Sequence, residues 1–173
     1  NLNHIIKATY TFSFQFPKIS FLFAENNIYV GNWKVLPIGL FSVVIDNTES
    51  NYFFINKELI ALKLKKRNRF THKGVFGHAW LAAGSYGKFG AAVLCARSCL
   101  RSGVGLLTVY VPKTGYEILQ ISVPEAMVST DETKTDFSIT QGLFEFDAIG
   151  IGPGIGTNTK TQEFLKKILE GKI

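Results

Sequence analysis

Two glycine-rich segments carry the residue types best suited to binding chemistry. The first, residues 84–92, reads Gly-Ser-Tyr-Gly-Lys-Phe-Gly-Ala-Ala, follows a short apolar run and opens a helix-like stretch. Glycines let backbone amides approach a ligand closely, and the free N–H groups in the first turn of a helix attract anions. The segment therefore predicts a phosphate-cradling loop, although Phe89 stands where a Walker A loop needs Ser or Thr. A tight strand-to-helix turn would account for the same glycines.

The second segment, residues 150–158, reads Gly-Ile-Gly-Pro-Gly-Ile-Gly-Thr-Asn and also lies between an apolar run and a helix-like stretch. Ile155 occupies a position where a Rossmann fingerprint needs glycine, so dinucleotide binding of that kind is not supported. Pro153 stiffens the loop and the bare glycines suit a flat ring or sugar lying on the backbone. Thr157 or Asn158 is interpreted as the N-cap of the helix that follows.

The elements around these segments alternate between strand-like and helix-like patterns. Strands are expected at residues 78–83, 106–111, 126–129 and 146–152, and helices at 91–101, 113–121 and 158–170. This alternation predicts a doubly wound α/β layer with a parallel sheet. The carboxyl ends of parallel strands share one edge, so the two glycine loops should meet there and form a small-molecule site. Its candidate residues are Gly84, Ser85, Gly87, Gly90, Gly152, Pro153 and Gly156.

The first fifty residues have a different character. Residues 9–16 alternate aromatic and polar side chains, which predicts a strand whose face of Tyr10, Phe12, Phe14 and Phe16 is buried. Residues 21–23 and 28–30 are interpreted as short strands or a helix end, and 35–40 as a further strand. The polar stretch 46–51 suggests a boundary, and the basic run 57–73 a solvated linker, with attraction of anionic nucleotides as a secondary possibility.

Composition narrows the class of protein. With 173 residues, 46% of them hydrophobic, the chain is expected to fold as a soluble protein. No apolar run reaches the roughly 20 residues of a membrane span and no leader is visible, so we expect a cytoplasmic protein without a membrane partner. No nucleic-acid module surrounds the basic run, so no nucleic-acid partner is expected. Cys95 and Cys99 lack further ligands at zinc-type spacing and are interpreted as small hydrophobes, so no metal residue is assigned.

Four segments in order resemble the opening of the NAD(P)H-hydrate dehydratase family: residues 69–78, 83–92, 101–106 and 152–157. Upstream, residues 11–18 and 29–39 resemble the last strands of the NAD(P)H-hydrate epimerase domain that precedes the dehydratase in bifunctional forms. The resemblance predicts three parts: a C-terminal piece of an epimerase-like domain at 1–45, a linker at 46–68, and the N-terminal half of a dehydratase domain at 69–173. Both ends of the sequence are expected to be cut.

The resemblance implies a ribokinase-like α/β layer, of which only the first half is present, preceded by terminal strands of a Rossmann-like epimerase domain. It implies nucleotide-dependent dehydration of hydrated NADH or NADPH, with ATP or ADP and Mg²⁺ as cofactors. Phosphorylation of the added hydroxyl would make it a good leaving group, and elimination would restore the ring. Ala91 and Gly154 match family positions that line the hydrated dinucleotide.

The resemblance also implies what is missing. The family's catalytic aspartate and its lysine-bearing nucleotide loop would fall after Ile173, and the epimerase aspartate and cation site before Asn1. No catalytic residue is therefore assigned, and the chain alone is expected to be inactive. Lys18 and Lys88 are interpreted as solvated lysines. Two alternatives stay open: a ribokinase-like kinase of a small alcohol or vitamin, and a non-catalytic nucleotide-binding or scaffold fragment. The full-length protein is expected to be a homo-oligomer.

Overall fold

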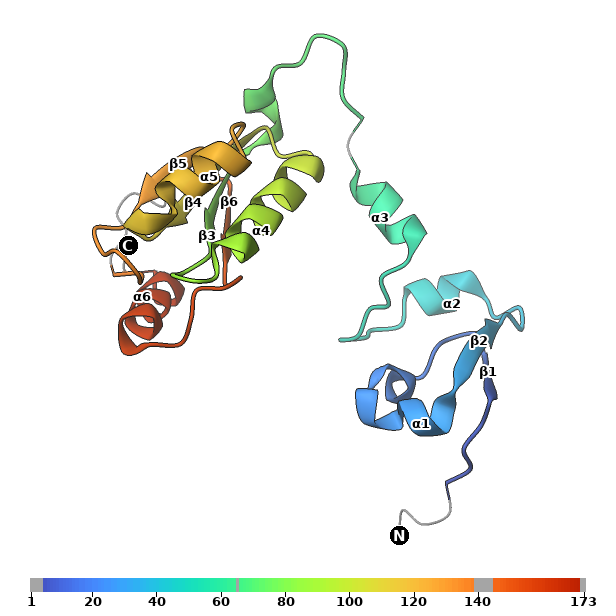
Figure 1. Cartoon of the computed structure of the whole chain (residues 1–173). Coiled ribbons are helices and arrows are strands. Elements are labelled where there is room, and N and C mark those ends of the chain that lie inside the picture. The colour runs from blue at the N-terminus through green and yellow to red at the C-terminus, as the bar shows by residue number, and fades with distance from the viewer. Residues whose placement is uncertain (1–4, 65, 139–144, 172–173) are drawn as a thin grey trace. The chain divides into compact units, whose positions relative to one another are not determined.

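The computed structural model describes residues 5–64, 66–138 and 145–171, and the chain divides into two compact units, Asn1–Lys65 and Lys66–Ile173. Figure 1 shows the elements of both. In the described part of the chain no helix is long and apolar enough to cross a membrane. The division expected from the sequence, at 46–68, stays a prediction, and the structure adds that this stretch contains a short helix, α3 (Lys57–Lys63).

The first unit is built on two parallel strands, β1 (Tyr10–Phe14) and β2 (Asn32–Leu36). The connection between them is helical, with two 3-10 turns, Ile19–Leu22 and Ala24–Asn26, followed by α1 (Asn27–Val30). The short helix α2 (Ser42–Asp46) follows β2. Residues 28–30 are thus helical, which was one of the two structures that their sequence allowed.

The expected burial of β1 is wrong. Tyr10, Phe12 and Phe14 are 61%, 60% and 64% exposed, whereas Ser13 on the opposite face is buried. Alternation correctly indicated a strand, but burial also requires a second layer over the apolar face. The connection to β2 instead lies against the other face, where the Thr11 hydroxyl donates to the Val30 carbonyl at 2.6 Å. Within the described residues, the aromatic face has no layer over it.

In its described residues, the second unit is an α/β layer with four strands, which are all parallel. Its elements are the 3-10 turn Lys73–Phe76, β3 (His78–Ala82), α4 (Phe89–Arg101), β4 (Leu106–Val111), the 3-10 turn Lys113–Gly115, α5 (Tyr116–Ser122), β5 (Met127–Thr130), β6 (Ala148–Ile151) and α6 (Thr159–Leu169). The strand order is β5-β4-β3-β6. The predicted fold class is confirmed, and each expected strand and helix of this unit is present to within a few residues.

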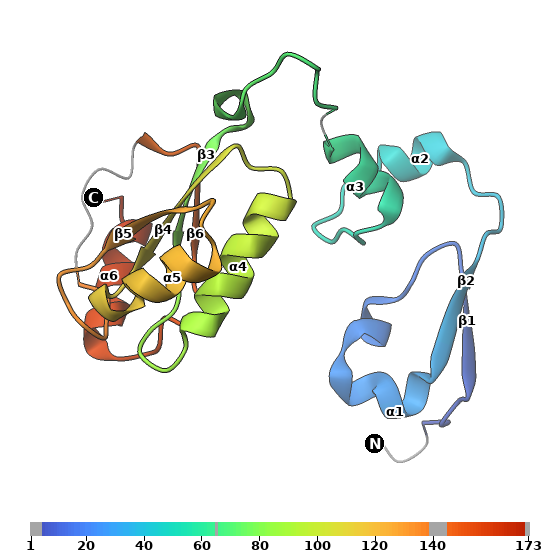
Figure 2. The same ribbon diagram turned by 45° about the horizontal axis from the view of Figure 1, so that its top comes forward.

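Alternating residues of β3 and β4 divide the core of this unit into two clusters, one on each face of the sheet. Leu81 and Val109 point to the face covered by α4 and α5, and Trp80 and Tyr110 point to the face covered by α6. Figure 2 shows α4 and α5 on one side of the strands and α6 on the other. Because β3 and β4 are buried on both faces, they read as continuous apolar runs in the sequence.

Candidate functional site

The strand order reverses at β3. The chain moves from β3 to β4 and β5 on one side, and then returns to place β6 on the other side of β3. In open parallel sheets, ligands bind beyond the carboxyl ends of the strands at such a switch point. The two glycine loops leave the carboxyl ends of β3 and β6, so the fold places them side by side at this point, as the sequence predicted.

Two hydrogen bonds join the loops directly. The Gly84 amide donates to the Pro153 carbonyl at 2.7 Å, and the Ser85 hydroxyl donates to the Gly154 carbonyl at 2.7 Å. Ser85 is 8% exposed, so its hydroxyl needs a partner, and the second loop supplies it. The segments that the sequence suggested separately therefore form one bonded structure.

At Gly154 there is no room for a side chain between the second loop and the start of α4. A Cβ at this position would lie 2.9 Å from the Ala91 Cβ and 3.1 Å from the Lys88 carbonyl oxygen, and the backbone has φ +72°. Both the space and the conformation therefore require glycine. The two residues that the family resemblance matched, Ala91 and Gly154, are in contact, and the first turn of α4 packs on the second loop.

The other predicted residues surround this contact. Nothing lies within 4 Å of a Cβ built on Gly87, Gly90 or Gly152, so at these positions the backbone faces open space. A Cβ on Gly156 would lie 3.9 Å from Ser85 Oγ and 4.0 Å from Asn158 Nδ2. The backbone of both loops is thus bare next to a small set of polar side-chain atoms, as a small-molecule site requires.

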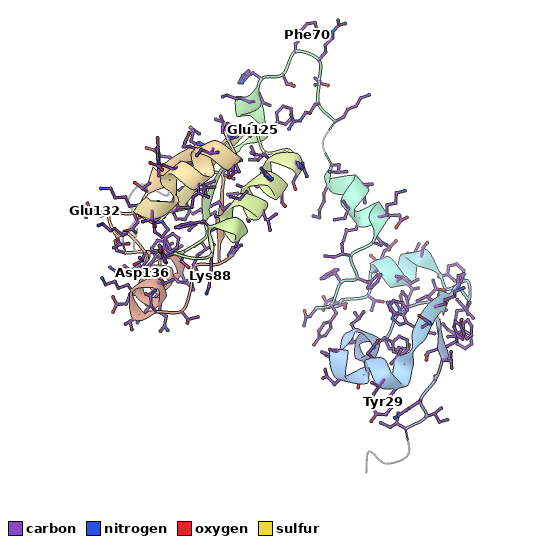
Figure 3. The ribbon with its side chains drawn as sticks, viewed as in Figure 1. Tyr29, Phe70, Lys88, Glu125, Glu132 and Asp136 are labelled. Atoms are coloured by element: carbon purple, nitrogen blue, oxygen red, sulfur yellow. The ribbon has the colours of Figure 1, made fainter. Side chains whose placement is uncertain are left out.

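The structure adds a third segment that the sequence did not reveal. Residues 131–138, which follow β5, fold back to the same edge of the sheet. The backbone amide of Tyr86 lies 3.5 Å from the Thr135 carbonyl oxygen. The side-chain amide nitrogen of Asn158, Nδ2, donates to Asp136 Oδ1 at 2.6 Å. In Figure 3, the labelled Asp136 and Lys88 lie at one end of this unit and Glu125 at the opposite end. The sequence signal that could have indicated this third segment is the polar stretch directly after β5.

A buried carboxylate holds this third segment in place. Asp131 is 2% exposed and accepts hydrogen bonds from the Tyr110 hydroxyl at 2.7 Å, the Thr133 amide at 2.8 Å, and both the amide and the hydroxyl of Ser138 at 2.7 Å. Burial by itself raises the pKa of a carboxyl, but these hydrogen bonds outweigh it and the Asp131 pKa is lowered. Burial, followed by the bond to Asp131, raises the pKa of Tyr110.

The two cysteines lie away from this edge, on α4. Both are free and partly buried, and both pack against the cluster beneath α4 and α5. Burial raises the pKa of the Cys95 and Cys99 thiols, so they stay protonated at neutral pH. Their interpretation as small hydrophobic residues is confirmed.

The described residues do not fit a magnesium site. They contain no group of three or more His, Cys, Asp or Glu side chains placed to hold a metal ion. The carboxylates near the glycine loops are instead engaged by neighbouring groups, as Asp136 is by Asn158 and by the Thr135 hydroxyl at 2.9 Å. No step of a reaction is therefore assigned to a metal held by these residues.

A parallel sheet with two bonded glycine loops at its switch point defines an α/β domain of the kind that binds small molecules at this edge. Comparison with known proteins identifies which one. Residues 79–172, more than half of the chain, match the family profile described as NAD(P)H-hydrate dehydratase. The chain belongs to this family.

Named relatives agree with the match. The bifunctional NAD(P)H-hydrate repair enzyme Nnr of Vibrio cholerae is 30% identical over 97% of this chain and 34% of its own length. The ADP-dependent (S)-NAD(P)H-hydrate dehydratase of Listeria monocytogenes is 36% identical over 62% of this chain and 38% of its own length. The chain therefore spans about a third of the length of the curated relatives that it matches.

A solved structure supports the fold. The ADP/ATP-dependent NAD(P)H-hydrate dehydratase of Bacillus subtilis, co-crystallized with ATP and Mg²⁺, superposes with a TM-score of 0.56 and 28% identity over 70% of this chain and 44% of that one. A ribokinase-like superfamily protein of Enterococcus faecalis gives the same TM-score with 27% identity. The ribokinase-like assignment made from the sequence is confirmed.

Proposed function

We propose that this chain is part of an enzyme that repairs hydrated NADH and NADPH, and that it contributes the first half of the dehydratase domain. The observation that carries the proposal is the bonded pair of glycine loops at the β3 and β6 carboxyl ends, in a chain that belongs to the dehydratase family. The preceding unit is proposed to be the end of an epimerase domain. The match of the Vibrio cholerae bifunctional enzyme over 97% of the chain supports this, since it includes that unit.

In this proposal the hydrated dinucleotide lies on the backbone of the two loops. Ala91 and Gly154 form the floor where the loops touch, and the open backbone at Gly87, Gly90 and Gly152 leaves room for a ring or a sugar. Gly84, Ser85, Pro153 and Gly156 hold the loops together or line the same edge. Small residues serve here because any side chain would occupy the space of the ligand or separate the loops.

The chemistry is proposed to follow the relatives. A nucleoside di- or triphosphate with Mg²⁺ would phosphorylate the ring hydroxyl, which makes that group a good leaving group. The described residues of this chain bind and orient the dinucleotide. They do not form a metal cluster, so the nucleotide, the metal and the base are proposed to be held by other parts of a longer protein.

The test compares this 173-residue chain with a longer protein that contains it, each supplied with hydrated NADH and ATP or ADP. The longer protein should restore the absorbance of reduced nicotinamide, and the short chain should bind the substrate without turnover. A stable phosphorylated product from the longer protein would point to a small-molecule kinase instead. Turnover by the short chain would contradict the assignment of the base to another part of the protein.

Two further expectations about the whole protein stay predictions. These are its assembly as a homo-oligomer and its location in the cytoplasm. Light scattering on the longer protein would test the first, and fractionation of the producing cells would test the second.

A further inference from the structure

We propose that Asn158 is a further substrate-binding residue, and that Asp136 positions it. Asn158 is the N-cap of α6, and its Oδ1 accepts a hydrogen bond from the Thr161 amide at 3.0 Å. Its Nδ2 donates to Asp136 Oδ1 at 2.6 Å. This inference rests on the proposed function, because the ligand is the hydrated dinucleotide at the same edge of the sheet.

The two contacts determine which way the side-chain amide points. The backbone N–H of Thr161 can only donate, and both side-chain oxygens of Asp136 accept hydrogen bonds in the structure. The oxygen of Asn158 must therefore face Thr161 and its nitrogen must face Asp136. An amide nitrogen carries two hydrogens, and Asp136 takes one of them. Among the residues that the structure describes, the second hydrogen has no further acceptor, so it can donate to an oxygen of a bound ligand.

The position of this nitrogen matches the proposed site. It lies 4.0 Å from the point where a Cβ on Gly156 would stand, and Ser85 Oγ lies 3.9 Å from the same point. Asn158 is exposed, so a ligand can reach it. An ordinary N-cap needs only its oxygen. The additional contact to a carboxylate on a separate segment is what distinguishes Asn158 from a residue that only caps a helix.

Asp136 is held firmly enough to serve as a positioning residue. Its other oxygen accepts from the Thr135 hydroxyl at 2.9 Å, and its backbone carbonyl accepts from the Thr133 hydroxyl. The buried Asp131 carboxylate, which binds the amides of Thr133 and Ser138, fixes the segment on both sides of Asp136. The direction of the Asn158 amide is thus set by the third segment of the site together with the Thr161 amide.

A substitution at Asn158 can separate its proposed role in substrate binding from its role as the N-cap of α6. Asn158→Ser keeps an N-cap oxygen but removes the amide donor, so the affinity for hydrated NADH, measured by calorimetry on the full 173-residue chain, should fall about five- to tenfold. The matched control is Asn56→Ser, which makes the same change at the N-cap of α3, where Asn56 accepts from the Leu59 amide at 2.8 Å. The control should leave the affinity unchanged.

A double-mutant cycle tests the role of Asp136. Asp136→Ala should lower the affinity about threefold in the native chain, because the Asn158 amide then keeps only the contact of its oxygen to Thr161 and loses the one that holds its nitrogen. It should have no further effect in the Asn158→Ser variant, since Asp136 acts through Asn158. Equal losses in both backgrounds would contradict the positioning role.

A spectroscopic measurement closes the test. In ¹⁵N-labelled native chain, the side-chain N–H₂ signals of Asn158, assigned by their loss in Asn158→Ser, should shift when hydrated NADH is added. A shift with pyrophosphate as well would identify a phosphate oxygen as the acceptor, and a shift with the dinucleotide alone would identify an oxygen of its sugars or carboxamide. If loop amides shift but the Asn158 signals do not, this inference is overturned and the proposed function stands. If hydrated NADH shifts no signal at all, both are overturned.

Discussion

The Cβ of Ala91 lies 2.9 Å from the point where a Cβ on Gly154 would stand. The first turn of α4 therefore packs closely against the loop after β6. This close packing explains why residues 91 and 154 are alanine and glycine, which have the smallest side chains. The same contact should bear on stability and on the proposed ligand binding, because the loops must stay close to present one continuous backbone surface.

Gly154→Ala should destabilise the chain by about 1–3 kcal/mol, from strain at φ +72° together with the contact to Ala91. Urea unfolding would measure it. Gly87→Ala is the control, since its φ is +79° but nothing lies within 4 Å of the added Cβ. Adding Ala91→Gly to Gly154→Ala should recover part of the lost free energy of unfolding. Adding it to Gly87→Ala should recover none. Equal effects of the two alanine substitutions would show that only the backbone conformation matters.

Ser85→Ala removes the hydroxyl that bonds to the Gly154 carbonyl and should cost about 1 kcal/mol of unfolding free energy. It should also loosen the second loop, so exchange of the Ile155 amide hydrogen, which donates to the Gly152 carbonyl at 3.3 Å, should accelerate. Ser98→Ala, which removes an exposed hydroxyl bonded within α4 to the Leu94 carbonyl, is the matched change. Unaltered exchange at Ile155 would mean that the bond does not hold the loops together.

Asp131 should make the stability of this unit dependent on acid. Its pKa is lowered in the folded chain, so its contribution is fully present above its unfolded pKa of about 3.9 and is lost as the pH falls through the lower folded value. Asp131→Asn should therefore be less stable than the native chain at neutral pH, and the difference should shrink below about pH 4. Denaturant unfolding at several pH values would measure it.

The control for this measurement is Glu132→Gln, which removes one charge from the exposed side of the same segment; the charge of Glu132 is the smallest of the influences that raise the Tyr110 pKa. Its difference from the native chain should be small at neutral pH. A difference between Asp131→Asn and the native chain that stays constant down to pH 2 would contradict the role assigned to Asp131.

Much of the second unit could be predicted because the local sequence patterns of its strands, loops and helices all agree with one overall fold. Strands β3 and β4 are apolar runs buried on two faces, and each glycine loop lies where a strand gives way to a helix. Parallel strands joined by helices can be ordered in a sheet in only a few ways. The two glycine loops were therefore expected to meet at the carboxyl edge of the sheet.

Two features could not be predicted, for different physical reasons. The third segment contributes Asp136 through a fold-back whose partners, Tyr86 and Asn158, are distant in the chain, and no periodic pattern records such contacts. The exposed aromatic face of β1 shows the opposite case, since alternation reports which side chains share a face but not whether another layer covers it.

The bond between Ser85 and Gly154 spans 69 residues. A ribosome adds residues in order, so β3 and the first loop emerge well before the partner loop exists. During that interval the nascent chain has no second wall at the switch point. The proposed site can therefore form only after the segment that follows β6 has left the exit tunnel.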